Sequence, residues 1–227
     1  MRKLVMLASS AALLGASTTA AVASPELYVG AQMGYQDTSL EYGYKESSNV
    51  GPGQYSQTTD FSASGVAGSL FAGAKFSLGE GFFIAPEVNL GTSTADGGIS
   101  SNSSFFGSSS YELEAEAGQS YGLGVLLGKN LTSDTTIYGR LGYQRTEYEV
   151  SESGTNVDNW SEDETFGGVR YGIGMETALV DSLALRLDWS QTQYSDESFS
   201  EDMGTYTVTE SFEPTESLFQ VGLSYTF

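Results

Sequence analysis

Seven charged side chains recur at alternating positions within segments that are otherwise apolar or rich in glycine. They are Lys75, Glu87, Arg140, Arg170, Glu176, Arg186 and Asp188. Paired carboxylates can act as a general acid and a general base. However, the chain has no histidine, which is the commonest general base near neutral pH and the commonest metal ligand. Because cations accompany these carboxylates, we predict a structural cluster of ion pairs, and we expect neither enzyme activity nor a cofactor.

A second group of acidic residues lies in polar stretches between these segments. It comprises Glu112, Glu114, Glu116, the run Glu162-Asp163-Glu164, and the pairs Asp196-Glu197 and Glu201-Asp202. Clustered oxygen ligands could bind divalent cations weakly. A solvated, self-repelling surface is the simpler interpretation, because no fixed ligand spacing such as an EF-hand loop is present. We favour the solvated surface and keep divalent cations as the alternative.

Eight segments after residue 24 alternate with period two between an apolar face and a face of small or polar residues. They lie at 27–36, 70–78, 82–90, 121–128, 137–144, 169–177, 183–190 and 218–227. All seven charges fall on the small-residue face. A Lys or Arg on a lipid-exposed face would cost about 2–4 kcal/mol at the bilayer midplane. The charges therefore belong inside a closed barrel, where four cations and three carboxylates nearly cancel.

The connections between the segments alternate in length. Those after the second, fourth and sixth segments are short, whereas 37–60, 92–110, 151–164 and 195–213 are long and polar. This pattern predicts an all-β fold, an eight-stranded antiparallel transmembrane β-barrel with short periplasmic turns and four long extracellular loops. A soluble β-sandwich is the alternative, and the placement of the charges argues against it. Pro86 cannot donate a ladder hydrogen bond and predicts a bulge or a local break.

Aromatic residues mark two levels along the predicted strands. Tyr35, Tyr121, Tyr143, Tyr171 and Trp189 lie near the long connections, and Phe76, Phe82, Tyr225 and Phe227 lie near the short turns. Aromatic girdles of this kind flank the apolar band of membrane barrels at both interfaces.

The N-terminus is typical of a secretory signal. Arg2 and Lys3 precede an apolar run, and Ala21-Val22-Ala23 offers a small-x-small cleavage site. We expect residues 1–23 to be a cleaved signal peptide and residues 24–227 to form one barrel domain. An uncleaved membrane helix would need about 20 apolar residues, and this run is shorter. Loss of the two signal cations takes the formal charge from −20 to about −22, which disfavours nucleic acid as a partner.

The segments "YVGAQMGY", "FAGAKFSLGEGFFIAPEVNLG" and "TIYGRLGYQR", with the Phe-ended closing segment, resemble a known group of proteins. These are the small eight-stranded outer-membrane barrels of Gram-negative bacteria, the OmpA-like and opacity-like porin family. The resemblance implies export through the periplasm into the outer membrane, contact with its lipid and lipopolysaccharide, and recognition by the barrel-assembly machinery. By the same resemblance, Leu223, Tyr225 and Phe227 form the assembly signal.

Eight strands enclose an interior just wide enough to be filled by side chains. Phe71, Phe83, Leu126, Tyr138 and Leu218 share the inward face with the charged cluster. We therefore expect a structural or surface-interaction barrel with a filled lumen and acidic extracellular loops. The alternative function is a narrow or gated porin-like channel for small solutes or ions. A closed barrel has no strand edge left to pair, so we expect a monomer.

Overall fold

The computed structural model describes residues 24–103, 109–154, 160–195 and 197–227. One antiparallel sheet contains all the described strands. These are β1 (Glu26–Ser48), β2 (Gln54–Gly79), β3 (Phe82–Ser93), β4 (Asp96–Ser103), β5 (Ser109–Asn130), β6 (Thr135–Gly154), β7 (Trp160–Val180), β8 (Leu183–Tyr194), β9 (Glu197–Asp202) and β10 (Tyr206–Thr226). The predicted signal peptide, residues 1–23, lies outside the described residues. Within the described ranges, no helix is long and apolar enough to cross a membrane.

Eight of the strands close into a ring, which confirms the predicted barrel. Their order is β1-β10-β8-β7-β6-β5-β3-β2, and β2 pairs with β1 to complete the circle. Each ring strand is antiparallel to both of its neighbours. Because β1 pairs with both β10 and β2, the ring has no unpaired strand edge. The tight turns at Glu80-Gly81 and Asp181-Ser182 lie where the sequence predicts them.

The two faces of the ring differ in composition as the alternation predicts. On β2, Leu70 points outward with 62% of its surface exposed, whereas its neighbour Phe71 points inward and is 4% exposed. A cluster of buried apolar side chains fills part of the interior: Tyr28, Phe71, Phe83, Ala85, Leu126 and Tyr138. Among the described residues, no other protein layer covers the apolar side chains of the outer wall, which suits a wall that faces lipid.

Pro86 interrupts one ladder without displacing a strand. The β3–β5 register runs through Pro86 to Val125 without a shift. On the other side of β3, paired positions run to Gly73–Glu87 and resume at Phe76–Ile84 in the same register. Of the two outcomes predicted for Pro86, a bulge or a local break, the structure shows the local break. The register shift of this hairpin lies between Ser77 and Gly79.

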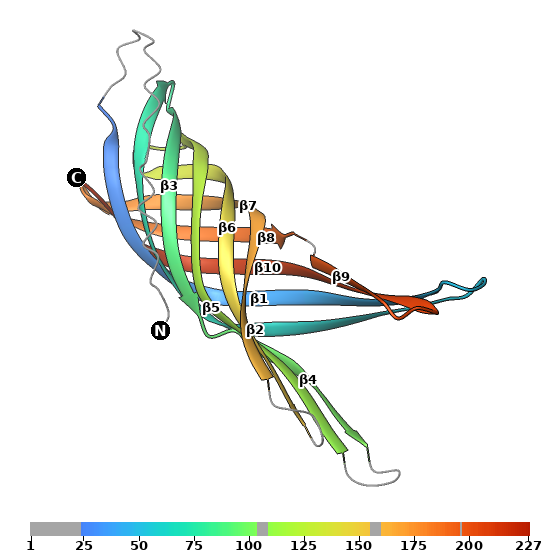
Figure 1. The fold of residues 1–227 in the computed structure, drawn as a ribbon. Coiled ribbons are helices and arrows are strands. Elements are labelled where there is room, and N and C mark those ends of the chain that lie inside the picture. The colour runs from blue at the N-terminus through green and yellow to red at the C-terminus, as the bar shows by residue number, and fades with distance from the viewer. Residues whose placement is uncertain (1–23, 104–108, 155–159, 196) are drawn as a thin grey trace, which may run out of the picture.

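The four long polar connections differ from the predicted loops, because most of their residues are strand. β1 and β2 continue together as far as the Ser47–Gln54 pair, and β4 and β9 pair with the extended parts of β5 and β10. Two arms result, one from β1, β2, β9 and β10 and the other from β4, β5, β6 and β7, and they diverge from one end of the barrel (Figure 1). Threonine and tyrosine favour extended backbone in water as they do in a membrane, so hydropathy marks where the lipid band ends and not where a strand ends.

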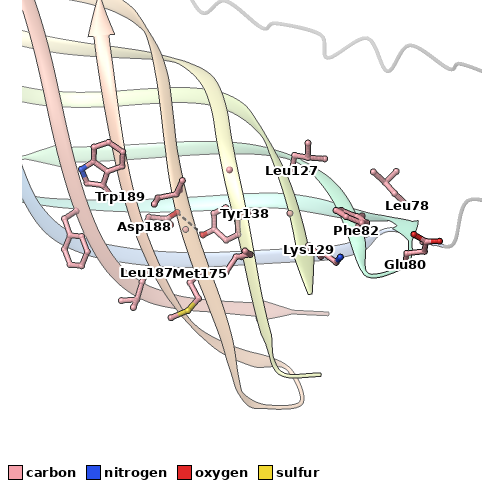
Figure 2. Close-up of a pocket in the computed structure, with 17 residues that line it drawn as sticks. Leu78, Glu80, Phe82, Leu127, Lys129, Tyr138, Met175, Leu187, Asp188 and Trp189 are labelled. Atoms are coloured by element: carbon pink, nitrogen blue, oxygen red, sulfur yellow. Dashed lines mark hydrogen bonds between the residues drawn. The ribbon is translucent and has the colours of Figure 1, made fainter. Parts of the chain in front are cut away.

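A groove of about 1070 Å³ crosses the outer wall (Figure 2). Leu78, Phe82 and Lys129 lie at one end, near the short β2–β3 turn, and Leu187 and Trp189 lie toward the other. Most of its lining is apolar and outward-facing, and Tyr138 and Asp188 of the inward face also border it.

Candidate functional site

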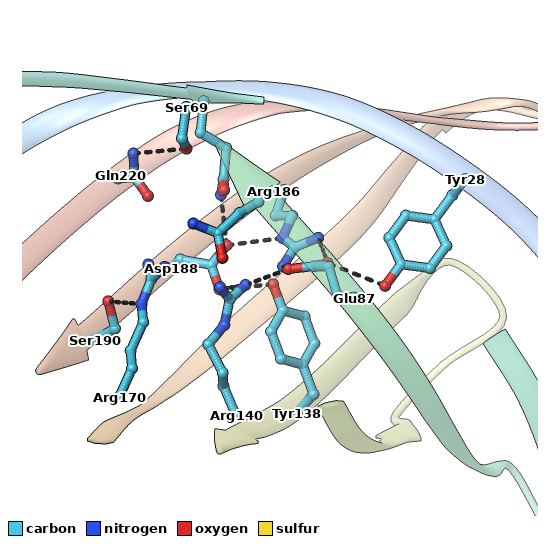
Figure 3. A network of polar contacts seen from close by, with 12 residues as sticks. Tyr28, Ser69, Glu87, Tyr138, Arg140, Arg170, Arg186, Asp188, Ser190 and Gln220 are labelled. Atoms are coloured by element: carbon cyan, nitrogen blue, oxygen red, sulfur yellow. Dashed lines mark hydrogen bonds and ion pairs between the residues drawn. The ribbon is translucent and has the colours of Figure 1, made fainter. Parts of the chain in front are cut away.

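Glu87 and Asp188 form the centre of a charged network inside the ring (Figure 3). Arg186 donates to Asp188 through Nε at 2.7 Å and to both oxygens of Glu87 through Nη1 and Nη2, at 2.7 and 3.1 Å. Arg140 donates through Nη2 to Glu87 Oε1 at 2.8 Å and lies 3.6 Å from Asp188 Oδ1. Two guanidinium groups and two carboxylates thus neutralise one another in a site where Arg186 is 1% exposed.

Neutral side chains satisfy the remaining lone pairs of the two carboxylates. The Tyr28 hydroxyl donates to Glu87 at 3.0 Å, and the Tyr138 hydroxyl donates to Asp188 at 2.8 Å. The Gln32 amide also donates to Asp188. The Arg186 guanidinium lies 4.1 Å from the centre of the Phe71 ring, which adds a cation–π contact. Full hydrogen bonding is the condition under which a buried ionic network is tolerated.

The other three predicted cluster residues lie at the margins of this network. Lys75 and Glu176 form a separate pair at 3.7 Å, toward the short-turn end of the barrel. Arg170 is buried, and it donates hydrogen bonds to two neutral side chains, Ser190 at 3.0 Å and Gln144 at 3.3 Å. The structure therefore brings four of the seven residues into direct contact and places the other three around them.

A second polar layer closes the ring on the side of the arms. Tyr194 donates to Glu216 at 2.8 Å, and its hydroxyl lies 2.7 Å from Thr146 Oγ1. Glu216 lies beyond Phe219, where the outward apolar face of β10 ends, so it is outside the membrane-spanning segment. Burial raises the pKa of the Glu216 carboxyl above its ordinary value of 4.5, while the Tyr194 hydrogen bond and the Arg170 charge oppose the rise.

Sequence reasoning missed Tyr28, Gln32 and Glu216 as members of these layers. Each shares its strand parity with inward residues, so the signal is present in the alternation. Glu216 is not predicted because the closing segment is expected to begin at Leu218. The apolar outer face that marks this segment starts only after Glu216. Inward polar residues continue past that point because the ring continues beyond the lipid band.

Little empty space remains beside the network. The hollow bounded by Glu87, Arg140, Gln144 and Arg170 has a volume of about 10 Å³, which is room for about one water molecule. A polar hollow of about 320 Å³ lies at the short-turn end, where Lys75, Asp134 and Glu176 are among its lining residues. The arrangement can hold charge in a fixed geometry, but its carboxylates are already occupied by cations and hydrogen-bond donors.

Comparison with known proteins identifies the family. The model of the outer membrane protein beta-barrel domain matches residues 6–227, nearly the whole chain. The chain belongs to this family. It is an outer-membrane β-barrel protein of the Gram-negative type, as the alternation and the closing segment predict.

Individual relatives are distant. Two proteins named "31 kDa outer-membrane immunogenic protein", from Brucella melitensis and Brucella suis, are each 25% identical over 214 residues, covering 84% of this chain and 86% of the relative. Among solved structures, the outer membrane protein OprG from Pseudomonas aeruginosa is similar, with a TM-score of 0.52, 11% identity and coverage of 90% of this chain and 97% of that chain. The likeness to OprG shows the fold alone.

The two arms of this outer-membrane protein each carry a row of carboxylates on directly opposed strand positions. Asp60, Glu41 and Glu213 lie side by side across β2, β1 and β10. A second row crosses β4 to β7 and consists of Asp96, Glu116, Glu149 and Asp163. Opposed like charges destabilise a strand pair, so these rows oppose the stability of the arms. The strand register reveals the rows, because their members are far apart in sequence.

The acid rows do not form a compact metal centre. In the described part of the chain, no group of three or more Asp or Glu side chains is close enough to hold a metal ion. The side chains of Glu112, Glu114, Glu162, Asp196 and Glu197 lie outside what the structure describes. The described part of the acidic arms therefore attracts cations through its summed negative charge and not through a defined metal site.

The three residues of the predicted assembly signal all face outward on the closing strand. Leu223 lies opposite Ala31 of β1, and Tyr225 lies opposite Val29. Phe227 is 78% exposed, packs edge-on against Tyr225 with 5.3 Å between ring centres, and donates its backbone N–H to the Leu27 carbonyl. They form a continuous apolar face at the seam where β10 meets β1.

Proposed function

We propose that this outer-membrane protein is a noncatalytic surface-interaction barrel. Its closed ring anchors two acidic β-sheet arms that contact cationic partners, or partners bridged by divalent cations, outside the cell. The observation that carries the proposal is the combination of a lumen filled by the Glu87–Asp188–Arg140–Arg186 network with arms that extend well beyond the apolar band.

The arms are hydrogen-bonded sheets, which suits a role in presentation. Asn49, beside the β1–β2 tip, donates its backbone N–H to the Thr205 carbonyl at 2.8 Å and its side-chain amide to Asp202 at 3.0 Å. Thr207 donates to the Asn49 side chain at 3.1 Å. The tips of two hairpins are thereby joined into one surface. The Brucella relatives are named immunogenic outer-membrane proteins, which is consistent with a surface that is presented outward.

Neutralising one acid row tests this proposal in living bacteria. The test variant combines Asp60→Asn, Glu41→Gln and Glu213→Gln. The matched control combines Glu26→Gln, Asp134→Asn and Asp181→Asn, which removes the same charge from the periplasmic end. We expect bacteria that make the wild-type or control protein to adhere to polylysine-coated beads more strongly than bacteria that make the test variant. Equal adhesion by all three strains would contradict the proposal.

A narrow or gated channel is a second candidate function. It is favoured by the two polar hollows, of about 320 and 10 Å³, that approach the network from the short-turn side and along the lumen. For an ion to pass between them, the pairs of Arg186 with Glu87 and Asp188 would have to separate. Leaving buried charges unpaired costs several kcal/mol, about 3–5 when one partner is lost, so opening would be rare.

A further inference from the structure

The groove on the outer wall has a defined floor and two defined sides. Its floor is an inward-facing row, Gly128, Tyr138, Gly174 and Asp188, which lie opposite one another on β5 to β8. One side contains Leu127 and Ile173, and the other contains Ile137 and Met175. Because these are neighbouring outward rows, the groove crosses the strands and runs obliquely over the wall of the barrel.

Gly139 leaves a gap in the outward-facing row that contains Leu127 and Ile173. It lies between Leu127 and Ile173 in the register, where any other residue would place a side chain in the groove. A Cβ atom built on Gly139 would meet nothing closer than a backbone oxygen at 3.9 Å. The space over Gly139 therefore comes from the missing side chain, and a methylene chain could occupy it without displacing any protein atom.

The end of the groove near the periplasmic turn carries two opposite charges. Lys129 faces outward with its ammonium 4.5 Å from the centre of the Phe82 ring. Glu80 lies in the β2–β3 turn and lines the same end of the groove, as Figure 2 shows. This end is at the level of the periplasmic aromatic girdle, where lipid headgroups lie.

Apolar character alone would not hold one lipid in such a groove, because lipid tails are as apolar as the side chains that line it. Selectivity must come from shape and charge. We propose that the groove binds one zwitterionic phospholipid of the periplasmic leaflet. Its phosphate contacts Lys129, the ammonium of its headgroup contacts Glu80, and one acyl chain lies over Gly139.

Native mass spectrometry of the purified mature protein, supplied with equal amounts of phosphatidylethanolamine and phosphatidylglycerol, tests the proposal. Wild-type protein is expected to retain one phosphatidylethanolamine. Gly139→Leu places a side chain where the acyl chain would lie and should abolish this retention. Gly68→Leu is the matched control, because Gly68 faces outward at a place outside the groove, and a Cβ atom there would also meet nothing closer than a backbone oxygen at 3.9 Å.

Charge variants separate headgroup recognition from groove shape, because each replaces a charged side chain by a neutral polar one. Lys129→Gln is expected to lower the retained fraction about fivefold, the factor for one basic residue at a membrane surface. Arg145→Gln, which removes an outward cation beyond the other end of the apolar band, should leave the fraction unchanged. Glu80→Gln should remove the preference for phosphatidylethanolamine over phosphatidylglycerol. Equal retention by the two leucine variants, or equal losses for Lys129→Gln and Arg145→Gln, would overturn the proposal.

Discussion

Arg186 of β8 donates two hydrogen bonds to Glu87 of β3 across the barrel interior, although the two residues are 99 positions apart in sequence. The contact joins strands that are not neighbours in the ring, so it ties opposite parts of the wall together. The same carboxylate also accepts from Arg140 and Tyr28. Loss of the Glu87 carboxylate would therefore remove an acceptor shared by two arginines and one tyrosine.

Replacing Glu87 with glutamine should destabilise the barrel strongly. The change leaves the Arg140 and Arg186 guanidinium groups with Asp188 alone, and breaking a buried ion pair costs about 3–5 kcal/mol. Urea unfolding of the refolded mature protein, followed by gel mobility, measures the loss. Glu26→Gln, at the exposed periplasmic mouth, is the control and should behave as wild type. Equal midpoints for the two variants would show that the network contributes little.

Replacing Glu41 with glutamine should stabilise the folded protein. Glu41 lies between Asp60 and Glu213, and like charges directly opposite on paired strands are unfavourable, whereas a favourable cross-strand pair contributes about 0.2–1 kcal/mol. The variant should therefore unfold at a higher urea concentration, and the gain should shrink at high salt. Asp37→Asn is the matched control, because Asp37 lies on the same strand between Ser64 and Ser217. An equal increase in the urea midpoint for Asp37→Asn would show that the increase does not come from the row of opposed carboxylates.

Glu216 should make stability depend on pH. Burial raises the pKa of its carboxyl in the folded protein, so the folded state holds this proton more tightly than the unfolded chain does. The contribution is then fully present below the unfolded pKa and is lost as the pH rises through the folded value. Between about pH 4 and about pH 8, the wild type should lose more stability than Glu216→Gln. Parallel curves for the two proteins would contradict this assignment.

Deleting Phe227 should impair assembly more than stability. The residue packs mainly on Tyr225 and is mostly exposed, so its removal costs the folded barrel few contacts. The amount of protein in the outer membrane should fall, while the purified variant should refold with a near-normal urea midpoint. Phe82→Ala, which removes another aromatic at the same girdle, controls for the loss of an interfacial ring. Unchanged outer-membrane levels after deletion of Phe227 would refute the role as an assembly signal.

The ring and its inward charges could be predicted because a membrane wall imposes a strict alternation. Every charge within the apolar band must face inward, so Arg140 and Asp188 could be placed on the same side of the wall without knowing their partners. The contacts themselves could not be predicted. Whether Arg186 meets Glu87 or Glu176 depends on the shear of the ring, which alternation within one strand does not determine.

The arms and their acid rows could not be predicted from sequence patterns. Outside the lipid band the outward face of a strand is polar as well, so the contrast between the two faces that marks strands in the sequence is lost at residues such as Asp37 and Ser217. The opposition of Glu116 and Glu149 depends on register, which is set by the hairpin and by the bulge between Ala117 and Ser120.

The proposed function requires that the lumen of the barrel is closed. Conductance of the purified mature protein in a planar bilayer tests it. With the Glu87–Arg186 pair in place, we predict no steady conductance, and the variant Glu87→Ala with Arg186→Ala should show openings that the wild type lacks. A steady open channel from the wild-type protein would contradict the closed lumen.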